Sequence, residues 1–252
     1  MENYTKWAEL LNRAVSEPGL ILKAYSAFWG YSLGNRVAAM YQCALRGIEP
    51  GPINTYPGWQ SLNRNVKKGE KAIWLCMPLT RKKENETGEK ETVITNFVWK
   101  PRWFVLSQTQ GEPIEAITTP AWDKDKALAE LGIQEIPFTL TDGNVQGYAQ
   151  KREIAISPIA AMPHKTLFHE AAHIELAHTL EQDFNDTEHT PRDLREVEAE
   201  SVALLLCESL ELPGAEFSRG YIQSWLRGEV IPEKSAQKIF GAADRILTAG
   251  TV

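Results

Sequence analysis

The chain has 252 residues, of which 43% are hydrophobic and 24% charged, enough for one large or two small globular domains. No apolar run approaches the roughly 18 residues of a membrane span, and the N-terminus does not read as a signal segment. The three cysteines form no C-x-x-C pair and no even framework, which indicates reduced thiols. We therefore expect a cytoplasmic protein with no membrane partner.

The net charge of −6 conceals two halves of opposite sign. Residues 1–120 hold 15 Lys and Arg against 11 Asp and Glu, a net charge of +4. Residues 121–252 hold 12 Lys and Arg against 22 Asp and Glu, a net charge of −10. A basic half of this kind is typical of proteins that contact polyanions. Gly and Pro cluster between residues 109 and 121, which predicts a linker there, with domains at 1–115 and 121–252.

The basic half begins with two predicted helices, at about 4–16 and 33–45, the second of which stops at Gly47. Two runs typical of strands follow at 72–79 and 92–106, and the charged segment between them predicts a β-hairpin. Pro101 interrupts the second run and predicts an edge or a bulge. We expect an N-terminal α/β domain with a β-hairpin.

Cations and aromatic rings occur together around this hairpin. Single-stranded DNA binds to such surfaces, because cations follow the phosphates and aromatic rings stack on bases. The alternative is a solvated, charged hairpin with its tryptophans in the core, which we prefer for Trp74 and Trp99. No helix-turn-helix or zinc-finger pattern indicates duplex recognition. The candidate DNA-binding residues are Trp59, Arg64, Lys67, Lys68, Lys71, Arg81, Lys82, Lys83, Lys100, Arg102 and Trp103.

The acidic half predicts mostly helices, so the fold class is α+β with a mostly helical C-terminal domain. A strand at 152–157 precedes its central helices, and we expect it to be an edge strand that pairs with a substrate backbone. The predicted helices cover residues 121–131, 166–180, 192–210, 217–227 and 233–248.

The predicted helix at 166–180 contains the sequence motif His169-Glu-Ala-Ala-His173. Histidines at positions i and i+4 share one helix face, so both imidazoles can reach one metal ion. Glu170 lies beside them and can polarise a metal-bound water as the catalytic base, which is the arrangement of zinc peptidases. The alternative is a surface helix with two unrelated histidines. We expect Zn²⁺ as the cofactor, with Mn²⁺ or another divalent ion as the alternative.

A catalytic zinc ion takes three protein ligands, and the acidic helix at 192–210 can supply the third. Glu196 and Glu200 share a face at the border of the buried stripe of this helix, whereas Glu198 points away and should be solvated. We predict Glu196 as the third metal ligand and Glu200 as the acceptor of a ligand histidine's free N–H. The alternative for both is an ordinary charged helix flank. His178 lies about 140° around the helix from His173 and should be structural or exposed.

Two segments of the chain resemble ArdC-type antirestriction proteins. Residues 55–75, with Val66-Lys-Lys-Gly-Glu-Lys71, resemble the signature of their N-terminal domain. The motif His169-Glu-Ala-Ala-His173 and the later segment Glu196-Val-Glu-Ala-Glu-Ser-Val-Ala203 resemble their C-terminal half. The N-terminal and C-terminal segments occur in the same order as in that family. The resemblance implies an N-terminal domain that binds single-stranded DNA and a zincin-like metallopeptidase domain. It also implies a protein that is carried by mobile elements such as plasmids and that protects incoming DNA from host restriction.

The chain departs from these relatives after the second histidine. They often continue with a Thr-Gly-His turn, whereas residues 174–178 here extend the predicted helix. The Glu196 and Glu200 pair is also similar to that of gluzincins and ImmA/IrrE-type peptidases. Three functions follow: a DNA-binding antirestriction peptidase that acts on a protein, for example a restriction-system component; a DNA-coating protein with an idle or structural metal site; and a regulatory peptidase of the ImmA/IrrE kind.

Overall fold

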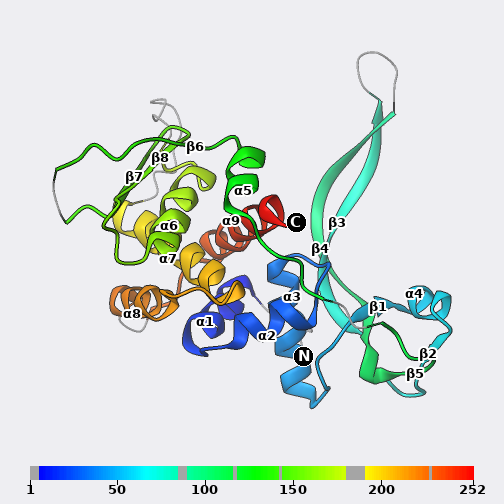
Figure 1. The fold of residues 1–252 in the computed structure, drawn as a ribbon. Coiled ribbons are helices and arrows are strands. Elements are labelled where there is room, and N and C mark those ends of the chain that lie inside the picture. Colours follow the sequence, from blue (N-terminus) through cyan, green and yellow to red (C-terminus); the bar gives the residue numbers. More distant parts are fainter. Residues whose placement is uncertain (1–5, 85–89, 116–117, 142–143, 180–190, 227–228) are drawn as a thin grey trace.

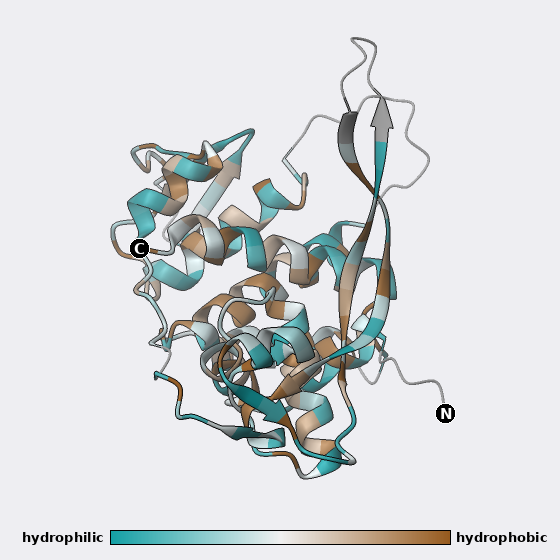
Figure 2. Ribbon diagram, turned by 90° about the vertical axis from the view of Figure 1, so that its right-hand side faces the viewer, coloured by the Kyte–Doolittle hydropathy of each residue, from teal (hydrophilic) through white to brown (hydrophobic). Residues whose placement is uncertain are grey.

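The computed structural model describes residues 6–84, 90–115, 118–141, 144–179, 191–226 and 229–252. A helical body contains both ends of the described chain, and a long hairpin projects from it (Figure 1). Hydrophobic and hydrophilic residues alternate along the helices of this body (Figure 2). Among the described residues, no helix is both long and apolar enough to cross a membrane.

Three helices open the described chain: α1 (Trp7–Ser16), α2 (Leu20–Ala27) and α3 (Leu33–Arg46). The sequence predicted α1 and α3, and α3 ends as expected at Gly47, whose φ of 63° suits glycine. It did not predict α2. The break after α1 is only a turn, in which Gly19 adopts a φ of 80° before the chain becomes helical again.

The hairpin is formed by β3 (Ile73–Glu84) and β4 (Lys90–Val105), which pair antiparallel. Both strands extend farther into the charged segment than the sequence predicted. β1 (Ile53–Thr55) pairs with the base of β4, so the sheet order is β1–β4–β3. Trp74 pairs with Pro101 while Ile73 pairs with Trp103, which confirms an irregularity at the predicted proline.

Helix α3 occupies the outer edge of β3 through two amide side chains. Asn35 donates to the carbonyl of Cys76 and accepts from its amide, both at 2.8 Å. Gln42 does the same for Trp74, at 2.7 and 2.9 Å. Backbone groups on a free sheet edge invite pairing with other chains, so these contacts protect the base of the hairpin.

A small unit beside the hairpin contains α4 (Tyr56–Ser61), β2 (Arg64–Val66) and β5 (Thr109–Gly111). β5 pairs with β2, so the predicted linker begins as a strand. Trp59 is 1% exposed and donates from Nε1 to the Phe104 carbonyl at 2.8 Å. Arg64 is also buried and donates from Nε to Thr109 Oγ1 at 2.9 Å. The prediction that these two side chains contact DNA is therefore wrong, because both are enclosed by this unit.

Replacing Trp59 by alanine should lower the free energy of unfolding by about 3–5 kcal/mol, because a large buried ring is lost. Urea denaturation measures this change. Trp59→Phe is the matched control: it keeps most of the volume, loses the hydrogen bond to Phe104, and should cost nearer to 1 kcal/mol. A Trp59→Ala protein of unchanged stability but weakened DNA binding would restore the original prediction.

The C-terminal half starts with α5 (Lys124–Leu131) and a three-stranded sheet of β6 (Gln134–Glu135), β7 (Gly147–Gln150) and β8 (Glu153–Ile156). The strand order is β6–β8–β7, with β8 parallel to β6 and antiparallel to β7. The predicted strand at 152–157 therefore lies in the middle of the described sheet, and its prediction as an edge strand is wrong. β7 lies at the edge instead.

Helices α6 (Pro163–Glu175), α7 (Arg192–Ser209), α8 (Ala215–Leu226) and α9 (Glu233–Gly250) complete the body. α7 is buried on nearly all sides, rather than along one stripe as its sequence suggested. One continuous hydrophobic core includes residues from α1–α3 and from α6, α7 and α9. The described core thus crosses the predicted boundary at residues 115–121, and the division into two domains stays a prediction.

The three N-terminal helices share one feature at their starts: none has a side-chain cap from its own N-cap residue. Carboxylates from the C-terminal half accept their free amide hydrogens instead, each contact being of a kind worth about 1 kcal/mol. Both halves therefore contribute to the same helix ends. The contacts are Glu233 with the amides of Trp7 (3.0 Å) and Ala8 (2.9 Å), Glu208 with Ile21 (3.1 Å), and Asp244 with Leu33 (2.8 Å).

Candidate metal centre and nucleic-acid surface

Helices α6 and α7 bring the three predicted metal ligands together. The Nε2 atoms of His169 and His173 lie 3.1 Å apart, and Glu196 Oε2 lies 3.5 and 3.7 Å from them. A tetrahedral ion with bonds of about 2.0–2.1 Å separates its ligand atoms by about 3.3 Å. The three side chains therefore fit one divalent ion. Within the described residues, His169, His173 and Glu196 form the group of possible metal ligands whose ligand atoms all lie within 4.8 Å of one another.

Glu200 orients the first of these histidines. Its Oε2 lies 2.7 Å from His169 Nδ1, and its Oε1 lies 2.6 Å from Lys165 Nζ. A ring proton on Nδ1 that donates to Glu200 leaves Nε2 free for a metal ion. The structure thus places Glu200 where the sequence predicted it, and adds Lys165, which the sequence did not reveal.

The second histidine is held by a pair that the sequence predictions placed elsewhere. α6 ends at Glu175, and Ala177 takes a φ of 62°, so the backbone N–H of His178 returns to the carbonyl of His173. The rings then meet, with 3.0 Å between the two Nδ1 atoms, and His178 Nε2 lies 2.9 Å from Glu198 Oε2. The helix therefore ends short of its predicted bound at residue 180, which lies outside the described residues.

Glu198 is 1% exposed, so the prediction that it is solvated is wrong. The physical reason is that α7 is covered on the face where Glu198 lies, and His178 supplies the partner. With one proton on each ring, His173 Nδ1–H donates to His178 Nδ1 and His178 Nε2–H donates to Glu198. His173 Nε2 is then unprotonated and directed at the other two ligands.

Charge in the centre follows from these contacts. Burial opposes protonation of His169, but Glu196 and Glu200 outweigh it and raise the pKa of His169 to about 9. Hydrogen bonds from the two histidines lower the pKa of Glu196, and those from His169 and Lys165 overcome burial and hold the pKa of Glu200 at about 2. Burial raises the pKa of Glu170, so this carboxylate accepts a proton more readily than an exposed glutamate.

Replacing Glu198 by glutamine should lower divalent-metal affinity about 10-fold, the lower end of the range for residues behind a metal ligand. Glutamine keeps the shape and an acceptor for His178 but removes the charge that holds its proton. Competition titration against a metal-sensitive dye measures the affinity. The control is Glu130→Gln, on the exposed side of α5. Equal affinities for Glu198→Gln and the unmodified protein would contradict the role of this pair.

The centre opens into two adjoining cavities of about 480 and 380 Å³, both lined by Gly147, His169 and Glu170. Edge strand β7 borders the larger one through Tyr148, and Arg192 and Arg195 line it from α7. Glu170 is thus accessible from both sides. The larger cavity thus lies beside a described sheet edge, where an extended chain can pair with the strand.

The hairpin and its base present most of the other predicted DNA-binding residues. Trp103 is half-buried, and its ring meets Tyr31 edge-on at 6.5 Å, so it belongs to the packing at the base of the hairpin. Lys83 lies in β3, but its side chain is outside the described residues. The exposed cations are Lys67, Lys68, Lys71, Arg81, Lys82, Lys100 and Arg102.

Comparison with known proteins identifies the N-terminal domain and the fold. Residues 3–102 match the family model of the N-terminal domain of anti-restriction factor ArdC. The metal-free crystal structure of antirestriction ArdC protein from R388 plasmid has 23% identity, a TM-score of 0.53, and coverage of 98% of this chain and 95% of that chain. The Mn(II)-bound structure of that protein has 22% identity and a TM-score of 0.55, and the match covers 98% of each chain. No curated protein matches the chain.

The matched N-terminal segment contains the motif Val66-Lys-Lys-Gly-Glu-Lys71. The structural likeness covers 98% of this chain, which includes the metal centre and the last helices. These findings confirm the resemblance drawn from the sequence and the α+β fold class. Residues 3–102 form an ArdC N-terminal domain, and the chain shares the fold of the R388 ArdC protein along nearly its whole length.

Proposed function

We propose that this chain is an antirestriction protein that binds single-stranded DNA and uses a metallopeptidase centre against a protein that threatens incoming DNA. The observation that carries the enzymatic half is the convergence of His169, His173 and Glu196 beside a half-buried Glu170. The test is whether the chain protects unmodified plasmid DNA during transfer into a restricting host. Protection that equals that of an empty vector would refute the proposal.

The DNA half of the proposal rests on residues 1–115. Seven exposed cations lie on the hairpin and its base, and the same segment matches the ArdC N-terminal domain. A projecting two-stranded ribbon can approach a strand of DNA without obstruction from the body (Figure 1). Its charges would follow the phosphates, a contact that does not depend on base sequence.

Replacing Arg81 and Lys82 together by alanine should weaken binding to single-stranded DNA and reduce its salt dependence. Each phosphate contact contributes about 0.7 to the slope of log affinity against log salt for single strands, so the slope should fall by up to about 1.4. Fluorescence anisotropy of a labelled oligonucleotide at several salt concentrations measures both quantities. The control is Lys124→Ala on α5, which is not part of the hairpin (Figure 1). A slope equal to that of the unmodified protein would remove these two residues from the interface.

The centre would hold a divalent ion on His169, His173 and Glu196. Two imidazoles and a carboxylate suit Zn²⁺, and Mn²⁺ is the alternative because the R388 relative binds Mn(II). A bound ion supplies Lewis acidity, which lowers the pKa of its water and polarises a carbonyl group. The ligand tautomers fixed by Glu200 and by the His178 and Glu198 pair prepare both Nε2 atoms for this ion.

The remaining steps belong to the protein's own residues. Glu170 accepts the proton of the attacking water on its carboxylate and delivers it to the leaving amine, for which its raised pKa is suited. The edge of β7, at residues 147–150, would hydrogen-bond to an extended substrate backbone. The substrate is a protein, such as a restriction-system component, and the setting is the cytoplasm, where incoming DNA meets that system.

A further inference from the structure

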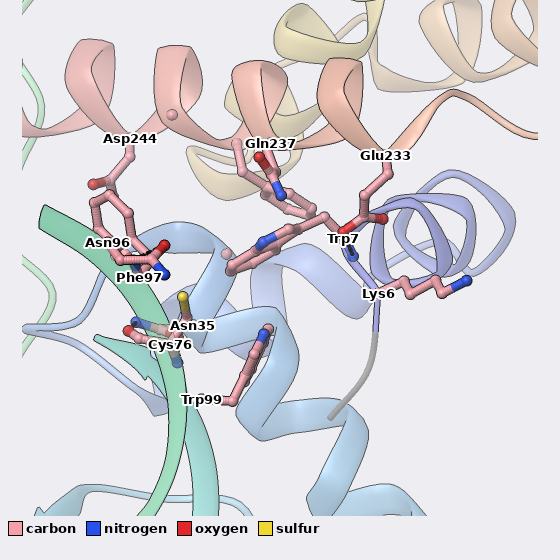
Figure 3. A pocket seen from close by; sticks show the side chains of 14 residues that line it. Lys6, Trp7, Asn35, Cys76, Asn96, Phe97, Trp99, Glu233, Gln237 and Asp244 are labelled. Atoms are coloured by element: carbon pink, nitrogen blue, oxygen red, sulfur yellow. Dashed lines mark hydrogen bonds between the residues drawn. The ribbon is translucent and has the colours of Figure 1, made fainter. Parts of the chain in front are cut away.

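A cleft of about 510 Å³ lies at the foot of the hairpin, between β4, α1 and α9 (Figure 3). Aromatic rings form its wall: the Trp7 ring lies 5.1 Å from that of Trp99 and 5.7 Å from that of Phe240, between centroids. Phe97 borders the cleft from β4 and is 61% exposed. A ring this exposed is free to contact a ligand that enters the cleft.

The two carboxylates in the cleft do not make it a site for cations. Glu233 accepts from the backbone amides of Trp7 and Ala8, and Asp244 accepts from that of Leu33. Both charges therefore sit at helix N-termini, where the helix dipole offsets them.

The polar groups still available in the cleft are neutral or positive. The side chains of Gln237 and Lys6, which line the cleft, make no hydrogen bond to another described residue (Figure 3). Amide groups can both donate and accept, as the edge of a nucleobase requires, and the ammonium of Lys6 suits a phosphate.

We propose that this cleft holds a base of single-stranded nucleic acid, stacked on Phe97 and against the tryptophan wall. The proposal rests on the proposed DNA binding and names the place where a base enters. The cleft volume lies within the range of about 300–1,000 Å³ for sites that enclose small ligands. Stacking on aromatic rings accepts any base, which suits a protein that must bind DNA regardless of sequence.

The hairpin continues the site away from the cleft. Phe97 pairs with Pro78, Ile94 with Thr80, and Thr92 with Lys82, and paired residues share one face of the ribbon. Ile94 is 59% exposed, and Lys82 lies about 13 Å beyond Pro78 along β3. A strand whose base enters the cleft would thus pass an apolar side chain and then a cation.

The test measures the binding of the full chain to two labelled oligonucleotides of equal length, one of thymidines and one of abasic residues. Phe97→Ala should lower affinity for the thymidine strand about 5- to 150-fold, the range for loss of one base–aromatic stack. Phe97→Trp should restore it. The matched control is Leu79→Ala, an exposed side chain on the opposite face of the ribbon. The abasic strand should bind the unmodified protein and Phe97→Ala equally.

Three results would overturn the inference. If the unmodified protein binds the thymidine strand and Phe97→Ala binds it equally, the cleft holds no base while DNA binding by the chain stands. If Phe97→Ala weakens binding of the abasic strand as much as that of the thymidine strand, the ring acts on the fold rather than on a base. If the unmodified protein binds neither strand at low salt, the proposed DNA binding itself falls, and the inference with it.

Discussion

Replacing Glu196 by alanine is expected to abolish tight binding of a divalent metal ion. The carboxylate supplies one of three ligand atoms, and the remaining two histidines hold an ion far less firmly. Changes behind a ligand already cost about 10–100-fold in metal affinity, so loss of a ligand should exceed about 100-fold. Metal content after dialysis against Zn²⁺ or Mn²⁺, followed by competition titration, measures the effect.

The matched control is Asp193→Ala, an exposed acidic residue one turn earlier on α7. It should leave the metal content unchanged. Glu196 is itself 37% exposed, so its loss should not unfold the chain, and circular dichroism checks this. Metal retained by a folded Glu196→Ala protein would place the third ligand elsewhere.

The second large effect is expected from Glu170→Gln, which should retain the metal but remove the base. Glutamine has nearly the same shape and cannot accept the proton from water, and general-base catalysis contributes about 10²–10⁴-fold to a rate. Cleavage of a proteome-derived peptide library, followed by mass spectrometry, measures the activity. The metal content of the same preparation is the internal control.

The same substitution separates the functions in a cell. If Glu170→Gln keeps its metal but no longer protects incoming DNA from restriction, the chain acts as a peptidase. If protection survives, the chain protects by coating DNA, and the metal centre is idle or structural. If the unmodified protein cleaves a host repressor and gives no protection, the centre belongs to a regulatory peptidase of the ImmA/IrrE kind.

The sequence predicts those features of this chain that depend on neighbouring residues. The end of α3 at Gly47 and the long hairpin follow from glycine and from hydrophobic runs, which act within a few residues. The His169 and His173 pair is equally local, because the spacing within one helix fixes the shared face. Glu196 needed only the further assumption that the next helix packs against the first.

The features that the sequence did not predict depend on long-range packing. Trp59 belongs to a basic, aromatic segment, and only the fold of β2 and β5 around it encloses the ring. The position of His178 depends on a turn at Ala177, a residue without the usual signature of a left-handed conformation. Once the helix ends there, the angle calculated for a continuous helix no longer applies.

The capping of the N-terminal helices by distant carboxylates bears on how the chain is made. A ribosome delivers residues 7–46 first, while Glu208, Glu233 and Asp244 are still untranslated. Domains usually fold in order of synthesis. Here the first three helices lack their caps until α7 and α9, which carry the capping carboxylates, have left the ribosome. The N-terminal helices and the metal centre would therefore reach their final packing together, once residues 208–244 have been synthesised.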